Sequence, residues 1–244
     1  MPAKNSIKHF IENSYYHLYN RGVEKRIIFL DEQDYAVFFS YLKIYLLPKD
    51  AIGLQNILLS EEVGWAQKEQ ARKLLRLNNF SDTLSLVAFC LMPNHFHFLV
   101  KQTEINTIDR FMNSLCTRYS MYFNKKYHRV GPLFQGLYKA VYVHSDEQLL
   151  YLTRYIHRNP VDLYSQGSAL RIYAYSSYSR YLGITKEGWI KPDDVLAFFG
   201  SKGKFSYESF VEGQEFIEAQ EHISSLLIDG EDMDSQGSAL RITN

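Results

Sequence analysis

This chain has few cysteines, no long apolar run and no net charge. It has two cysteines among 244 residues, too few for the disulfide framework of a small secreted protein, so Cys90 and Cys116 are expected to be free thiols. No apolar run approaches the ~20 residues that a membrane span needs. The first ten residues contain no apolar signal segment. A cytoplasmic location without membrane contact is the default expectation.

The formal net charge is zero, but the charges are unevenly distributed. Residues 101–160 hold nine Lys and Arg against four Asp and Glu, whereas residues 184–234 hold four lysines against twelve acids. A basic middle and an acidic end cancel in the total, and such asymmetry indicates a charged partner where the total does not. Two solvated faces would explain the charges equally well.

The apolar residues predict alternating strands and helices. Strands are expected at 15–20, 84–91, 95–101 and 136–143, and helices at 31–47, 105–127 and 145–159. This order predicts an α+β fold with a ferredoxin-like split βαβ antiparallel sheet, helices on one face and a helical C-terminal extension. We expect the sheet domain to span residues 1–183.

Two regions lie outside this pattern. Residues from about 49 to 82 are polar and helix-leaning, and they are expected to be an insertion in the sheet domain. Residues 184–244 form the acidic extension, with helices expected at 191–199 and 207–227. Ser165–Ile172 recurs letter for letter as Ser235–Ile242. Two distant copies do not make a repeat architecture, so a duplicated coding fragment is the preferred interpretation and no function is drawn from it.

A pair of histidines on one predicted strand is the first chemical signal. His95 and His97 are two residues apart, so their imidazoles project from the same face of a strand while Phe96 and Phe98 enter the opposite face. Two adjacent imidazoles are suitable ligands for a divalent ion. Two exposed histidines on a half-buried strand would give the same pattern.

Tyr155 and Asn159 provide a second, weaker signal. They are four residues apart at the end of the last predicted core helix and therefore share one of its faces. An amide oxygen is a suitable hard ligand, and a nearby cation favours deprotonation of a phenol. Pro160 is expected to push Asn159 out of helical geometry. A packed tyrosine and a helix-ending asparagine remain the simpler interpretation of this spacing alone.

Several sequence blocks occur in a fixed order: His17–Gly22, Met92–Val100, Phe111–Leu115, Arg118–Asn124, Gly131–Gly136 and Tyr155–Val161. Together they resemble the single-tyrosine HUH transposases of the IS200-like superfamily, and most of all the REP-associated tyrosine transposases. The resemblance covers about residues 15–183 except the insertion.

The resemblance implies that His95 and His97 bind a divalent metal, Mg²⁺ or Mn²⁺, that Tyr155 is the nucleophile and that Asn159 completes the metal site. Nearer insertion-sequence relatives have Gln at the position of Asn159. The implied function is metal-dependent cleavage and strand transfer of single-stranded or hairpin DNA through a 5′-phosphotyrosine.

Basic residues of the middle segment are the expected phosphate contacts. These candidates are Arg118, Lys125, Lys126, Arg129, Lys139 and Arg158. Two other functions stay open at this point: a DNA-binding protein that keeps the fold without cleavage, and a metal-dependent hydrolase with His17 as a third ligand. Whether the chain is a monomer or a homodimer is also open.

Overall fold

Four strands form one sheet in the computed structural model, which describes residues 10–163 and 169–213. They are, in chain order, β1 (Ser14–Arg21), β2 (Leu84–Met92), β3 (His95–Gln102) and β4 (Lys139–Tyr142). Their order across the sheet is β2-β3-β1-β4, and every neighbouring pair is antiparallel. This is the predicted ferredoxin-like split βαβ arrangement.

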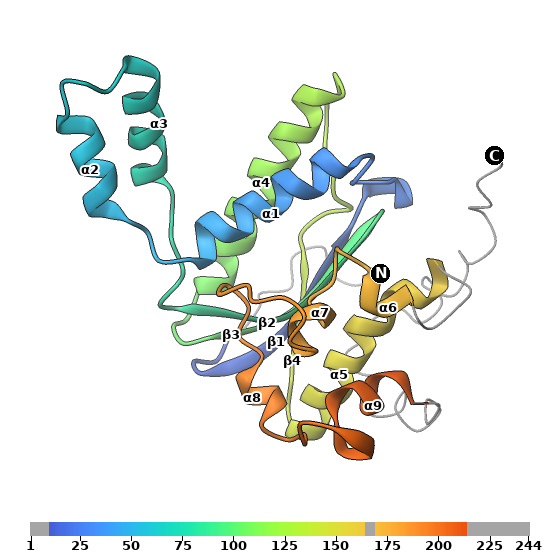
Figure 1. Cartoon of the computed structure of the whole chain (residues 1–244). Coiled ribbons are helices and arrows are strands. Elements are labelled where there is room, and N and C mark those ends of the chain that lie inside the picture. The colour runs from blue at the N-terminus through green and yellow to red at the C-terminus, as the bar shows by residue number, and fades with distance from the viewer. Residues whose placement is uncertain (1–9, 164–168, 214–244) are drawn as a thin grey trace.

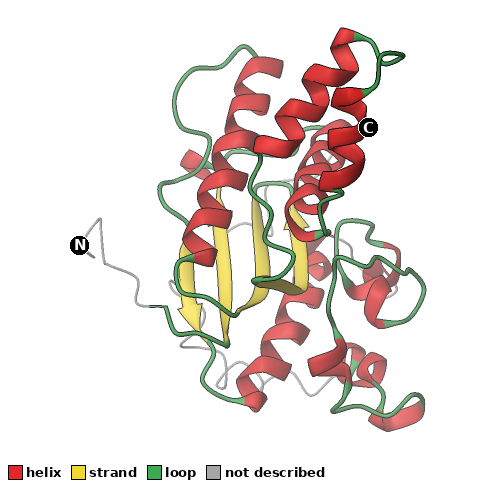
Figure 2. Ribbon diagram, turned by 90° about the vertical axis from the view of Figure 1, so that its left-hand side faces the viewer, coloured by secondary structure: helices red, strands yellow, loops and turns green. Residues whose placement is uncertain are grey.

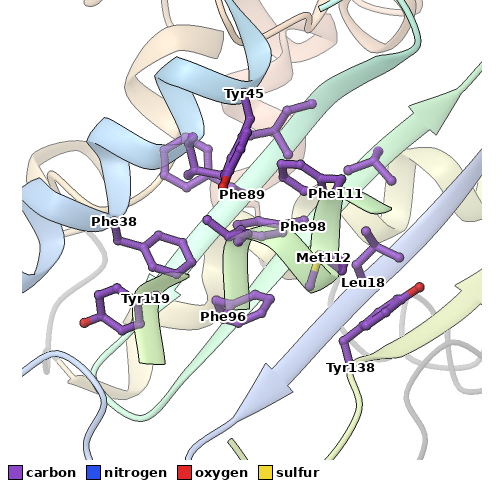
Figure 3. Close-up of a cluster of buried hydrophobic side chains, with 14 of the residues drawn as sticks. Leu18, Phe38, Tyr45, Phe89, Phe96, Phe98, Phe111, Met112, Tyr119 and Tyr138 are labelled. Carbon is purple, nitrogen blue, oxygen red and sulfur yellow. The ribbon is translucent and has the colours of Figure 1, made fainter. Parts of the chain in front are cut away.

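One face of the sheet packs against two long helices, α1 (Glu32–Leu46) and α4 (Thr107–Lys126). The carboxylate of Asp31 accepts a hydrogen bond from the backbone N–H of Asp34 and so caps α1. The buried aromatic core between these layers is shown in Figure 3. It includes Leu18, Phe38, Phe96, Phe98, Phe111 and Tyr119. The alternation of β1 and β3 therefore places these apolar side chains on the α1–α4 side.

The opposite face is covered by α5 (Asp146–Arg158), so the expectation of helices on one face holds only for α1 and α4. Leu149, Leu152 and Ile156 of α5 pack in one core with Cys90 and Leu99 of the sheet. The reason lies in β2, whose continuous apolar run is buried on both faces and requires cover on each. In Figure 2 the sheet stands between the two groups of helices.

Two helices lie between α1 and β2, in the segment expected to be an insertion. They are α2 (Ala51–Leu59) and α3 (Trp65–Arg76), which pack mainly against each other. Figure 1 shows this helical pair standing away from the sheet. We call it the α2–α3 arm.

The chain after α5 continues in short elements. These are η2 (Asn159–Leu163), α6 (Ala169–Ile172), α7 (Tyr178–Tyr181), α8 (Asp193–Leu196), η3 (Gly203–Phe205) and α9 (Tyr207–Glu212), in addition to η1 (Val23–Lys25) after β1. Tyr178, Val195 and Val211 join the core beneath α5. The division of the chain at residue 183 stays a prediction.

Some sequence expectations differ from these elements or fall outside the described ranges. The helix expected at 191–199 is shorter in the structure, where α8 begins at Asp193, after Pro192 at the N-cap position, and ends at Leu196. The part of the expected 207–227 helix beyond residue 213, residues 165–168 and the copy at 235–242 lie outside the described residues. Cys90 and Cys116 are free thiols, as expected. In the ranges described here, no helix is both long enough and apolar enough to span a membrane.

Candidate active site

His95 and His97 project from β3 toward α5, where they meet Tyr155. The two imidazole ring centroids are 5.0 Å apart with planes at 85°. The phenol of Tyr155 lies edge-on to His97, with ring centroids 5.4 Å apart. The Tyr155 hydroxyl is shielded from solvent. The structure therefore brings the histidine pair of β3 and the tyrosine of α5 together.

Asn159 lies beside Tyr155 and faces His95. Its backbone dihedrals are φ −46° and ψ −39°, so the expectation that Pro160 would displace it from helical geometry is wrong. The backbone instead continues directly into η2, which begins at Asn159. The side-chain N–H of Asn159 donates to the Tyr155 carbonyl oxygen over 3.0 Å. This bond directs the amide oxygen toward His95 Nε2, which is 3.4 Å away.

A hydrogen bond from His95 to the amide oxygen of Asn94 fixes the tautomer of His95. His95 Nδ1 is 2.6 Å from Asn94 Oδ1, and an amide oxygen only accepts, so Nδ1 carries the proton. The amide nitrogen of Asn94 donates to the Lys25 carbonyl, which fixes the amide orientation. In neutral His95 the Nε2 lone pair therefore faces the Asn159 oxygen. Two acceptors turned toward each other form a suitable site for a cation.

His17 performs the matching role for His97. Its Nε2 lies 2.9 Å from His97 Nδ1, and the two rings stack with centroids 5.1 Å apart. His97 Nε2 is buried and has no hydrogen-bond partner among the described residues. A histidine that binds a metal through one nitrogen usually has its other nitrogen held in this way. His17 thus uses its Nε2 to contact His97, so it is placed as a partner of a candidate ligand.

Burial keeps both candidate ligands neutral. It lowers the pKa of His95 to about 4, with a smaller contribution from the positive charge of Arg21. Burial also lowers the pKa of His97 well below its usual range, assisted by His95 and His17. Since only neutral imidazole offers a lone pair, both Nε2 atoms are available to a cation at neutral pH.

The donor set fits a hard or borderline divalent ion. It offers two imidazole nitrogens and one amide oxygen, and it leaves coordination positions open for water or phosphate oxygens. Within residues 10–163 and 169–213, no group of three or more His, Cys, Asp or Glu side chains forms a metal cluster. Asn159 is therefore the candidate third ligand beside the two histidines, since no carboxylate belongs to the group.

Arg21 is a site residue that the sequence analysis missed. It pairs directly with His95 across β1 and β3, so both side chains point to the α5 side. Its guanidinium donates to the side chain of Gln135. The signal was present in the sequence, because His17, Tyr19 and Arg21 alternate along one strand and share a face.

Of the six basic candidates, Lys139 is placed on the site face by its strand register. It pairs with Tyr19, which pairs with His97, and it is exposed. Arg158 lies near Tyr155 in sequence, but its guanidinium donates to the Val211 carbonyl over 2.8 Å. These two residues therefore differ: Lys139 faces solvent at the sheet edge, while Arg158 attaches α5 to α9.

The four candidates on and after α4 lie on the opposite side of the sheet. Arg118 stacks on Tyr41 at 4.0 Å. The Lys126 ammonium contacts Asp31 at 2.7 Å and Asp34 at 2.8 Å, and Arg129 donates to Asn124. Lys125 is exposed. The contacts of Arg118, Lys126 and Arg129 are structural, and Lys125 is the member of this group most open to a partner.

The comparison with known protein families matches the part of the chain that contains the candidate site residues. Residues 62–159 match the family model described as Transposase IS200 like, and this stretch contains His95, His97, Tyr155 and Asn159. This part of the chain is similar to the IS200-like transposases, the family that the sequence blocks resemble. No curated protein sequence matches the chain.

Two solved structures share a weak likeness with the chain. A REP-associated tyrosine transposase bound to a REP hairpin is 10% identical, with a TM-score of 0.41 over 77% of this chain and 96% of that one. A protein described as a putative transposase from Deinococcus radiodurans R1 is 17% identical, with a TM-score of 0.33 over 63% and 96%. Both TM-scores are low, so neither likeness bears on the site.

Proposed function

We propose that this chain cleaves and rejoins single-stranded or hairpin DNA through a covalent 5′-phosphotyrosine formed at Tyr155, with a divalent metal held by His95, His97 and Asn159. The observation that carries the proposal is the meeting of this neutral histidine pair with the Tyr155 phenol. The IS200-like match over the same residues supports DNA as the substrate.

The chemistry is a balanced transesterification. Tyr155 Oη attacks the scissile phosphorus, the bond from phosphorus to the 3′ oxygen breaks, and the phenol proton is passed to solvent or a base. The leaving 3′ oxygen takes up a proton and becomes a free 3′-OH. Attack by a different 3′-OH on the phosphotyrosine releases Tyr155 and joins the strands. No nucleotide cofactor is consumed, because the phosphodiester is exchanged at each step.

The residues around Tyr155 prepare this attack. A phenol ordinarily has a pKa of about 10 and requires activation near neutral pH. When bound, a divalent cation polarises the phosphate and favours the phenolate. Asn94 holds His95 in the tautomer that presents Nε2. For His97 to present Nε2, its proton must lie on Nδ1, where His17 Nε2 is placed to accept it. Arg21 and Lys139 lie on the same face and supply positive charge for the phosphates.

The direct test is Tyr155→Phe with labelled hairpin DNA and Mn²⁺. Phenylalanine keeps the ring and removes only the attacking oxygen, so we expect loss of the covalent adduct with binding retained. Tyr151→Phe is the matched control, because Tyr151 lies one turn earlier on α5 and packs against Phe210, with ring centroids 5.6 Å apart. Undiminished adduct in Tyr155→Phe would remove Tyr155 from the mechanism.

The same experiment separates the proposal from a protein that binds DNA without cutting it. That alternative predicts equal DNA binding with and without metal, and no adduct in the parent protein. The proposed function predicts a metal-dependent adduct in the parent and in Tyr151→Phe.

A further inference from the structure

The α2–α3 arm carries a basic, aromatic face that the candidate active site does not use. Trp65, Lys68, Arg72 and Arg76 are spaced by three, four and four residues along α3 and therefore share one side of the helix. Lys73 adds a fifth member at the edge of this face. Glu69 is the one acid in α3, and it contacts Arg72 at 3.5 Å.

The other side of α3 packs on α2. Ala71 is buried there, with Leu74 and Leu75 partly buried beside it. The basic face is thus the solvent side of the arm, and Arg72, Lys73 and Arg76 are exposed. The arm is attached to the sheet domain at its base and stands away from the body (Figure 1).

Trp65 distinguishes this face from an ordinary solvated helix surface. Its side chain is 76% exposed, whereas the other tryptophan, Trp189, is 4% exposed. A tryptophan offers a large area to a partner, and its ring stacks well on nucleotide bases and sugars. Cations along one helix face match the regular phosphates of a nucleic acid. The exposed tryptophan and the row of cations together are more typical of a DNA-binding surface than of an ordinary solvated helix surface.

We propose that the basic face of α3 binds DNA at a distance from the scissile phosphate. This inference rests on the proposed function for its substrate. It adds a second contact surface, formed by Trp65, Lys68, Arg72, Lys73 and Arg76, that holds the stem or flank of the DNA.

The fold determines how remote this contact is. The arm joins the end of α1 to the start of β2, at the Leu84 end of the sheet, whereas His95 lies at the opposite end of β3. The eight residues of β3 span roughly 26 Å at about 3.3 Å per residue. One strand of a duplex advances about 3.4 Å per nucleotide. The arm is therefore reached only by DNA that extends more than about eight base pairs from the cleaved phosphate.

The test combines a charge-removal variant with substrate length. The arm variant is Lys68→Gln, Arg72→Gln and Arg76→Gln, and the matched control is Lys191→Gln, Lys202→Gln and Lys204→Gln, which removes three exposed charges elsewhere. Both are made in the Tyr155→Phe background for binding, so the readout does not depend on cleavage. Binding is measured by fluorescence anisotropy with a 20-base-pair hairpin and with a hairpin of six base pairs.

The arm variant is expected to bind the long hairpin at least tenfold more weakly than the control triple. Its log–log salt slope is expected to fall by about 2.7, for three phosphate contacts. Both triples are expected to bind the short hairpin equally. Quenching of tryptophan fluorescence by the long hairpin is expected in the parent and lost in Trp65→Phe. These results together would support the arm as a remote DNA contact.

Equal affinity and salt slope for the arm and control triples on the long hairpin would overturn the proposal. So would a loss that is equally large on the short hairpin. Ile52 lies on α2 of the arm. If Ile52→Glu changed the molecular mass measured by light scattering while the arm triple left DNA binding intact, the arm would join copies of the chain. This result would also overturn the proposal. The arm and control triples are also made with Tyr155 intact, and formation of the Tyr155 adduct on the short hairpin is measured. This result tests the proposed function separately, because the short hairpin does not reach the arm.

Discussion

Replacing His17 tests how the structure prepares the metal ligands. His17 is fully buried, and its Nε2 contacts His97 Nδ1 at 2.9 Å. His17→Leu introduces an apolar side chain of similar bulk and removes the hydrogen-bond partner of His97. The His97 proton is then free to shift to Nε2, which would remove the lone pair that faces the cation.

The expected magnitude follows from this single contact. Loss of a partner that orients a ligating histidine typically weakens metal binding about 10- to 100-fold, which corresponds to about 1.4–2.7 kcal/mol. Leaving the buried Nδ1–H of His97 unsatisfied is expected to lower the free energy of unfolding by about 1–3 kcal/mol as well. Both effects arise without substituting a proposed ligand or Tyr155.

In the assay, the protein is titrated with Mn²⁺, and binding is measured by calorimetry or electron paramagnetic resonance. Folding is checked by circular dichroism. His17→Gln is the conservative variant, because its amide oxygen can accept from His97 and should recover much of the affinity. His144→Gln is the control, since His144 is exposed and packs on Tyr142. A folded His17→Leu protein that binds Mn²⁺ as tightly as the parent would refute the reasoning.

Three further predictions concern charge, pH and metal. Arg21→Gln should weaken binding of short single-stranded DNA about tenfold and reduce the salt slope by about 0.7, whereas Lys43→Gln on α1 should change neither; equal slopes would exclude a phosphate contact. Burial lowers the pKa of His157 to about 3, so the unfolded chain binds more protons between about pH 3 and 6.5. Stability should therefore fall as the pH drops below 6.5, by about 2 kcal/mol between pH 7.5 and 5 for this residue; denaturant unfolding that is flat over this range would contradict the argument. Treatment with EDTA should abolish the covalent adduct, and Mn²⁺ or Mg²⁺ should restore it; adduct formed in EDTA would rule out a metal requirement.

Most of the sheet was predictable from the sequence because alternation and helical spacing are local signals. The strands around Tyr16, Phe89 and Phe98 and the α1 cap at Asp31 are present where the pattern predicted them. The pairing of His95 and His97 on one face followed from the same two-residue period. Their meeting with Tyr155 depends on long-range packing, and the sequence blocks rather than the spacing predicted it.

Other features could not be derived from local patterns. The position of α5 on the second face follows from the burial of β2 on both sides. The continuous apolar run of β2 indicates that both faces are covered, but it does not indicate which helix covers which face. The contact between His17 and His97 requires the β1–β3 register, which a single sequence does not give. The hydrogen bond from Arg158, a candidate DNA contact, to the Val211 carbonyl likewise depends on long-range packing.

The central claim is that Tyr155 carries the covalent link to DNA, and peptide mapping tests it most directly. Trypsin cuts after Arg154 and Arg158, so it releases Tyr155–Arg158, a peptide whose one hydroxyl group belongs to Tyr155. The protein is allowed to react with a short DNA in Mn²⁺ and is then digested with nuclease and trypsin. Mass spectrometry should find this peptide heavier by the mass of an attached nucleotide. A nucleotide on a different tyrosine, or DNA bound in the presence of Mn²⁺ with no modified peptide, would contradict the account.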